Sequence, residues 1–158
     1  MAWLIEPRFS SGGQGVRMAE VIVSVASCVE EGGERTVPAG SRIVLRFGWA
    51  QKNRGQVQAF LNAQTSTISL NGAAPIDVSD SYSPIEELPD GGFLDGGFVS
   101  RVRHDTGVTL SAGESLQVDV TVAVSHTVID FFDETTHKPV FFQPGDPFTL
   151  SCRITASA

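Results

Sequence analysis

Residues Leu116–Val128, with the sequence LQVDVTVAVSHTV, decide the fold class of this chain. Leucine or valine occupies every second position of this stretch apart from His126, and mostly polar residues fill the positions between them. Successive side chains of a β-strand point to opposite faces, so the alternation predicts a strand with one face in a core and the other in water. We expect His126 to continue the inward-facing row at the end of this strand.

Two other stretches show the same alternation. Apolar side chains recur at every second position of 148–154 and of 43–49. Such one-sided strands need a second sheet to cover their apolar faces, which favours a sandwich. Shorter runs predict further strands at 20–29, 67–70, 75–78, 98–104 and 108–110, with a hairpin turn at Asn71-Gly72. The sequence therefore predicts an all-β antiparallel sandwich of about eight strands, closed by pairing of its first core strand with its last.

One segment departs from the β pattern. Between Arg54 and Gln64 the apolar residues are Val57, Phe60 and Leu61, at a spacing that places them on one side of an α-helix. We expect one short helix that crosses an end of the sandwich and packs through this stripe. Two stretches rich in proline, glycine and acidic residues, 79–97 and 130–147, are predicted to be long loops.

Length and charge restrict the classes of function. A chain of 158 residues suits one domain, which we place at 18–158, after an N-terminal arm and linker at 1–17. The net charge of −7 repels phosphate, which argues against binding to nucleic acid and to anionic membranes. The chain has no apolar run of about 18 residues, so we expect no membrane insertion. Its first residues lack the basic flank and long apolar stretch of a signal peptide.

From Val37 onward the order of short motifs is similar to that of an uncharacterised type of bacterial exported Ig-like β-sandwich domain. The motifs are VPAG at 37–40, RFGWA at 46–50, NRGQV at 53–57, LNAQT at 61–65, AGESL at 112–116 and SH at 125–126. The resemblance covers most of the chain after Met18. It implies an Ig-like fold and an exported, often surface-attached module, and it implies no established chemistry and no functional residues.

Cys28 and Cys152 lie in the first and the last predicted core strands. If these strands are neighbours, a disulfide between them is geometrically natural and closes a loop over most of the chain. The alternative is a pair of buried free thiols. A catalytic cysteine is disfavoured, because Cys152 lies in mid-strand and nothing pairs it with a histidine. A disulfide indicates an oxidising compartment, so we expect an extracellular or cell-surface protein, with the cytoplasm as the alternative.

The end of the predicted strand Leu116–Val128 and the loop that follows it hold candidate metal ligands. They are His126, Asp130, Asp133, Glu134 and His137. Imidazole with carboxylates suits zinc, whereas carboxylates with carbonyl oxygens suit calcium. The spacing matches neither an EF-hand nor a zinc motif. The alternative is an ordinary loop with a histidine at the edge of the core.

No motif for catalysis stands out, and we expect no enzymatic activity. The chain has neither a Gly-x-Ser-x-Gly elbow nor a glycine-rich phosphate loop. A carboxylate pair for glycoside hydrolysis could come from Glu86, Glu87, Asp90 and Asp95, although acidic loop residues are usually only solvated. The repeat of DGGF at 90–93 and 95–98 is interpreted as two turns, with a calcium loop as the alternative.

The N-terminal segment carries the most specific expectation about function. It contains an apolar cluster too short to fold alone, Trp3, Leu4, Ile5 and Phe9, and then SSGGQG at 10–15, which is typical of a linker. Such a segment can fray in solvent, fold back on its own domain or add to an open sheet edge of a neighbouring subunit. Fraying is the least favourable of the three, because it leaves Trp3 and Ile5 in water. We therefore expect a structural or interaction module of an extracellular surface or filament assembly, which forms a homo-oligomer or polymer through this arm.

The alternative function is a carbohydrate-binding or other ligand-binding accessory module. Binding of a polysaccharide needs exposed rings, and the polar-tipped rings are Trp3, Trp49 and Tyr82. Trp49 is expected to be buried by its position in the alternation. Tyr82 and Trp3 are the candidates for exposure, which makes a thin platform for a sugar.

Overall fold

The structure, a computed structural model, describes residues 19–92, 94–132 and 135–158. Its elements, in chain order, are β1 (Glu20–Ser24), α1 (Val25–Glu30), β2 (Glu34–Val37), β3 (Ser41–Gln51), α2 (Arg54–Ala63), β4 (Gln64–Leu70), β5 (Ile76–Asp77), β6 (Glu86–Glu87), β7 (Phe98–Leu110), β8 (Ser115–Val124), β9 (Val128–Phe132), β10 (Pro139–Phe142) and β11 (Phe148–Ala156). The predominantly β class is confirmed. The described residues form eleven strands and two helices, where about eight strands and one helix were predicted.

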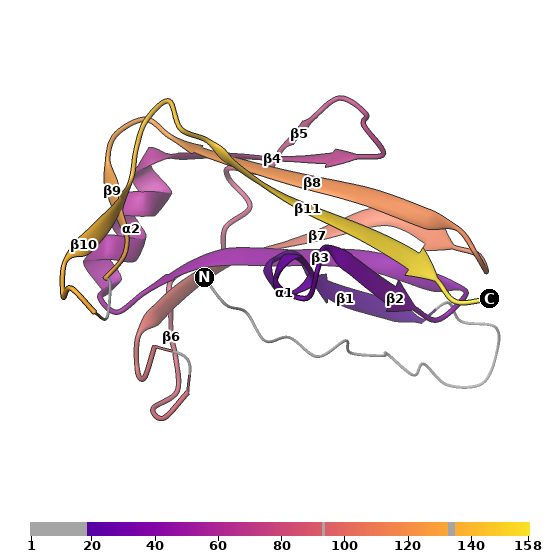
Figure 1. Cartoon of the computed structure of the whole chain (residues 1–158), viewed down its shortest axis with the longest axis horizontal. Coiled ribbons are helices and arrows are strands. Elements are labelled where there is room, and N and C mark those ends of the chain that lie inside the picture. The colour runs from indigo at the N-terminus through magenta and orange to yellow at the C-terminus, as the bar shows by residue number, and fades with distance from the viewer. Residues whose placement is uncertain (1–18, 93, 133–134) are drawn as a thin grey trace.

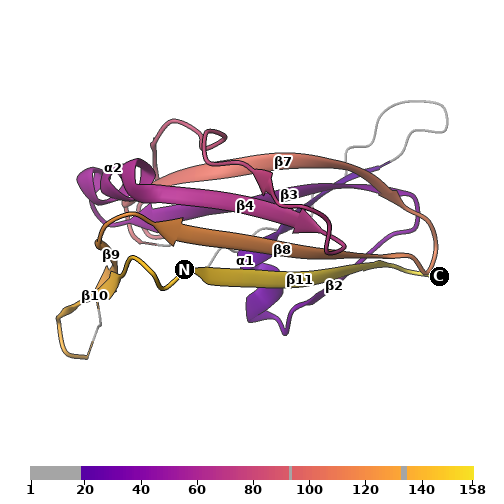
Figure 2. The same cartoon turned by 90° about the horizontal axis from the view of Figure 1, so that it is seen from above.

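Two sheets enclose one core. The first has the strand order β1-β3-β7-β6 and the second β2-β11-β8-β4-β5, while β9 and β10 form a separate two-stranded sheet (Figure 1). Figure 2 shows β4, β8 and β11 running alongside one another in the second sheet. The inward row of β3, from Ile43 to Trp49, shares the core with the valines of β8. The strand predicted from LQVDVTVAVSHTV is thus confirmed from Ser115 to Val124.

The strand predicted over 20–29 is wrong in its second half. β1 ends at Ser24, whose hydroxyl accepts the Ser27 N–H at 3.3 Å and so caps α1. The run 20–29 is apolar at odd and at even positions because β1 and then α1 each bury residues in the sandwich. Short apolar runs of this kind do not distinguish a buried strand from a buried helix, which explains the error.

The predicted pairing of the first core strand with the last is also wrong. β1 pairs with β3 in parallel, in the first sheet. The parallel neighbour of β11 is β2, which follows α1. The sandwich therefore contains two parallel pairs, and the segment from β1 to β2 crosses from one sheet to the other through α1.

A disulfide joins Cys28 to Cys152, with an S–S distance of 2.00 Å and a Cα–Cα distance of 5.9 Å. The two cysteines come together as predicted, although Cys28 lies in helix α1 and not in a strand. Both residues are 0% exposed. The bond fixes α1 to β11, so it connects the segment between the two sheets to the central part of the second sheet.

Two regions between the main strands differ from the prediction. β7 is one strand of 13 residues that merges the two strands predicted at 98–104 and 108–110. Its pairing with β3 has an irregularity at Arg42/Val44, near Gly107, which has a φ of 70°. The stretch 130–147, predicted as a loop, contains most of the β9–β10 hairpin.

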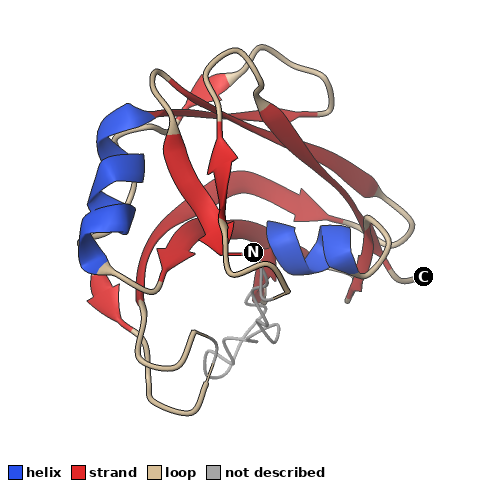
Figure 3. Ribbon diagram, turned by 60° about the vertical axis from the view of Figure 1, so that its left-hand side comes forward, coloured by secondary structure: helices blue, strands red, loops and turns tan. Residues whose placement is uncertain are grey.

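Helix α2 agrees with its prediction. Asn53 caps it by accepting the Gly55 N–H at 2.7 Å, and the helix buries Val57, Phe60 and Ala63. The Phe60 ring stacks on Trp49 with centroids 4.0 Å apart and an interplanar angle of 7°. In Figure 3 α2 and α1 lie at separate places along the sandwich. α2 thus closes the end where β3 finishes.

Candidate functional site

The β9–β10 hairpin carries the largest exposed aromatic side chains of the described residues. Phe131 is 50% exposed and Phe141 is 48% exposed. Cross-strand pairing places Phe131 opposite Val140 and Phe141 opposite Ile129, with a register shift that leaves Asp130 without a partner in the ladder. We call the four apolar residues Ile129, Phe131, Val140 and Phe141 the hairpin surface.

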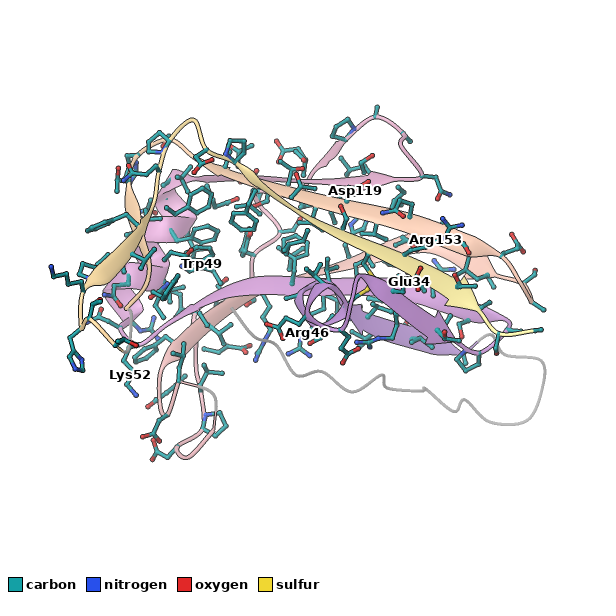
Figure 4. All side chains as sticks on the ribbon, in the orientation of Figure 1. Glu34, Arg46, Trp49, Lys52, Asp119 and Arg153 are labelled. Atoms are coloured by element: carbon teal, nitrogen blue, oxygen red, sulfur yellow. A yellow bond between two sulfur atoms is a disulfide. The ribbon has the colours of Figure 1, made fainter. Side chains whose placement is uncertain are left out.

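The base of the hairpin is anchored in the core. Phe142 is 6% exposed, with its ring centroid 6.0 Å from that of Trp49 and 5.1 Å from that of Phe148. Its cross-strand partner Val128 is also buried. Because neighbouring side chains alternate along a strand, burial of Phe142 turns Phe141 outward. Figure 4 shows Trp49 between the sheets on the side of α2 and the hairpin.

Gln51 attaches the hairpin to the sandwich. This side chain, at the end of β3, is 4% exposed, and its Nε2 donates hydrogen bonds to the carbonyls of Ile129, at 3.2 Å, and Asp130. One edge of β9 is therefore occupied by a side chain of the first sheet. Burial raises the pKa of the neighbouring Asp130 carboxyl above its ordinary value.

The predicted metal ligands have diverse surroundings. His126 does not continue the inward row, because β8 ends at Val124 and His126 is exposed in a bend, with Nδ1 3.3 Å from the Ser125 hydroxyl. His137 is exposed with a φ of 56°. Asp133 and Glu134 lie outside the described residues. Among the residues that are described, no three His, Cys, Asp or Glu side chains form a metal-binding group.

Two of the three candidate rings for sugar binding, Trp49 and Tyr82, are not exposed. Trp49 is buried, and its indole N–H has no hydrogen-bond partner among the described residues, so its contacts are packing contacts. Tyr82 is largely buried: its ring packs edge-on to Phe47 and Phe60, and its hydroxyl lies 2.9 Å from that of Ser66. Burial raises the pKa of Tyr82 to about 12. Trp3 lies outside the described residues.

Two acidic residues of 79–97, Glu86 and Asp95, are engaged in structural contacts. Glu86 pairs with Arg101 at 2.9 Å, and the neighbouring Glu87 follows it in β6, so the two carboxylates alternate in direction. Asp95 Oδ1 accepts the Gly91 N–H at 2.6 Å, which closes the turn. Lys52, labelled at the lower left of Figure 4, donates hydrogen bonds to the Leu94 and Asp95 carbonyls at 2.9 and 2.8 Å.

The outer face of the second sheet is polar, and that of the first carries ion pairs beside a small apolar cluster, Ala26, Ala50 and Val99, on which Leu88 and Leu94 pack. On the first sheet, Arg42 pairs with Asp105 at 3.0 Å and Arg103 pairs with Glu20. On the second, the Ser151 hydroxyl donates to Asp119 at 2.6 Å and further hydroxyl pairs join neighbouring strands. Figure 4 shows Glu34, Asp119 and Arg153 along this sheet. Surfaces with their polar groups already paired offer little to a partner, in contrast with the hairpin surface.

The hairpin surface escaped the sequence interpretation, although a signal was present. The two strands carry matching pairs of aromatic residues, Phe131-Phe132 and Phe141-Phe142, on either side of a polar stretch. Aromatic residues in short runs around turn residues indicate a hairpin. The acidic residues and the prolines of this region suggested a loop instead.

The arm residues Trp3, Leu4, Ile5 and Phe9 lie outside the described residues. Among the residues that are described, none belongs to a helix long and apolar enough to cross a membrane. Comparison with protein-family models, with curated proteins and with solved structures finds no match to this chain.

Proposed function

We propose that this chain is a non-enzymatic structural or interaction module of an extracellular surface or filament assembly, which self-associates through its N-terminal arm. The observation that supports it best is the hairpin surface. Phe131 and Phe141 each leave about half of the side chain in water, and burial of a large apolar side chain contributes about 1.5–3 kcal/mol. Exposed aromatic residues on an ordered hairpin favour contact with a partner.

The disulfide supports the proposed compartment. Disulfides persist in oxidising environments and are rare where thiols are kept reduced. Cys28 and Cys152 are wholly buried, so this bond is protected from reductants once it has formed. An oxidising location outside the cell or on its surface therefore accounts for the pairing.

The finer fold assignment, an Ig-like exported domain of bacterial type, is part of the same proposal. Two facing sheets around one core and an internal disulfide agree with it. A disulfide that ends in a helix differs from the strand-to-strand bond of antibody domains. The assignment thus rests on the layered architecture and on the order of motifs after Val37.

The test is the assembly state of the purified full chain. Mass photometry and electron microscopy over a range of concentrations should find dimers and longer ordered species in equilibrium with the monomer. A chain without residues 1–15 should remain monomeric under the same conditions. A full-length chain that stays monomeric at all concentrations contradicts the proposal.

A carbohydrate-binding module is the second candidate, and the two exposed rings of the hairpin surface are what favours it. Aromatic faces pack on the apolar faces of sugars. In that case the monomer should be retained on a polysaccharide matrix, and the double variant Phe131→Ala with Phe141→Ala should elute freely. A monomer that passes every matrix unretained removes this candidate.

A further inference from the structure

We propose that the open edge of β10 binds residues 2–6 of a second copy of this chain as an added strand. The inference rests on the self-association proposed above and names the surface that receives the arm. β10 pairs with β9 only, within the described part of the chain. The opposite side of the hairpin is engaged by Gln51 through the carbonyls of β9. The N–H and C=O groups on the outer side of β10 are therefore the available template, apart from Pro139, which has no N–H.

Three of the other outer strands, β2, β5 and β6, are less suited than β10 to accept a strand. β5 and β6 contain two residues each, and β6 consists of Glu86 and Glu87. β2 has the sequence ERTV and presents charged and polar groups, which discourage strand addition. β10 has the sequence PVFF and carries exposed Phe141 with half-buried Val140. Among these outer strands, β10 has both an open backbone edge and an exposed aromatic side chain.

The arm matches this edge in length and in pattern. Pro7 lacks a backbone N–H, so it ends a run of five residues, Ala2–Glu6, while β10 has four residues. Trp3 and Ile5 share one face of such a strand and Leu4 lies on the other. The hairpin is likewise apolar on both faces, because Phe141 and Val140 alternate along β10. An antiparallel pairing also brings Glu6 next to Lys138, which precedes β10 and is exposed.

The two attachment points lie at opposite ends of β3. Arg42, near the start of β3, donates its N–H at 2.8 Å to the carbonyl of Ala19, the first described residue after the arm. Gln51, the last residue of β3, holds the hairpin. The nine residue-to-residue steps from Arg42 to Gln51 span about 30 Å at about 3.3 Å per step. A donor and an acceptor at opposite ends make a head-to-tail contact, which propagates as a chain of subunits or closes as a ring.

The closing experiment mixes two deficient variants and measures mass by mass photometry. One is the chain without residues 1–15, which lacks the donor. The other is the full chain with Phe141→Asp, which puts a charge on the acceptor. We expect each alone to associate at least about 30-fold more weakly than the full chain. Mixed in equal amounts they should form a one-to-one dimer and nothing longer, because each supplies what the other lacks.

Ile76→Asp is the matched control, since Ile76 is 41% exposed on β5, away from the hairpin, and should leave assembly unchanged. Phe141→Ser should act in the same direction as Phe141→Asp, and the circular dichroism of both should match that of the full chain. A labelled peptide of residues 1–9 should bind the arm-deleted chain in fluorescence anisotropy and lose binding when that chain also carries Phe141→Asp.

The outcomes separate this inference from the proposed function. Assembly that needs the arm but persists with Phe141→Asp overturns the β10 acceptor and leaves self-association standing. Two variants that stay monomeric when mixed also overturn it, because a donor and an acceptor must complement each other. A full chain that is monomeric at all concentrations contradicts both proposals.

Discussion

Two regions of the sandwich are closed in different ways. Beside the middle of β3, where the chain passes from the first sheet to the second, the six-residue helix α1 is fixed to β11 by a wholly buried disulfide (Figure 1). At the end where β3 finishes, the ten-residue helix α2 and the β9–β10 hairpin are held by aromatic packing and by Gln51. Both helices are too short to be stable by themselves, so α1 depends on its buried residues and the covalent bond, and α2 depends on its packing. The region that lacks a covalent bond is the one with exposed rings and an open strand edge.

The largest expected effect on stability comes from removal of the disulfide. The variant Cys28→Ala with Cys152→Ala should lose about 4–5 kcal/mol of unfolding free energy at most in the chain-entropy model, because the bond spans 124 residues. Urea unfolding of both proteins measures the difference. Hydrogen exchange should rise most in α1 and β2 and least in α2. A loss below about 1 kcal/mol would show that packing alone fixes α1.

The next effect concerns the aromatic closure at the hairpin end. Phe60→Ala removes the ring stacked on Trp49 and should cost about 3–4 kcal/mol of unfolding free energy, the transfer and cavity cost of a buried aromatic residue. Leu61→Ala in the same helix is the control, with a smaller loss, because Leu61 is only half-buried. Urea unfolding is again the measurement. Equal losses of unfolding free energy for the two variants would contradict the conclusion that the stack of Phe60 on Trp49 holds α2 in place.

The sequence predicts the α1 region and the hairpin end of the sandwich unequally well. The alternation in β3, β8 and β11 and the stripe of α2 identify the central layers, because a one-sided strand or helix has a clear period. The α1 region is only partly predictable. The cysteine pair is visible in the sequence, but the run 20–29 is apolar at odd and at even positions, and such a run fits a strand and a helix alike. The hairpin end is missed because burial of Phe142 and exposure of Phe141 depend on packing against Trp49, which is distant in sequence, as well as against the nearby Phe148.

High pH should weaken the hairpin end selectively. Tyr82 packs on Phe60, and burial raises its pKa to about 12 from 10.0. A raised pKa means that the folded state holds the proton more tightly, so this stability is complete below pH 10 and is lost as the pH rises through 12. The loss attributable to Tyr82 should approach about 2–3 kcal/mol.

Tyr82→Phe provides the control for this pH dependence. Tyr82 is the only tyrosine in the chain, so ultraviolet absorbance of tyrosinate follows its titration directly. Between pH 10 and 12 the variant should lose less unfolding free energy than the parent, while lysine titration affects both equally. A tyrosinate signal with a midpoint at pH 10 in the folded protein would place the ring in water and refute the assignment.

The smallest effect tests the polar link between the hairpin and the sandwich. Gln51→Ala leaves two carbonyls of β9 without their donor and should cost about 1–2 kcal/mol of unfolding free energy. Because Phe142 still anchors the base, the global loss should be modest while hydrogen exchange rises in β9 and β10 alone. The β11 amides near Cys152 should exchange as before, since the disulfide fixes that region independently. A rise in exchange that spreads evenly over both sheets would show that the α1 region and the hairpin end open together, and it would contradict independent attachment of the hairpin.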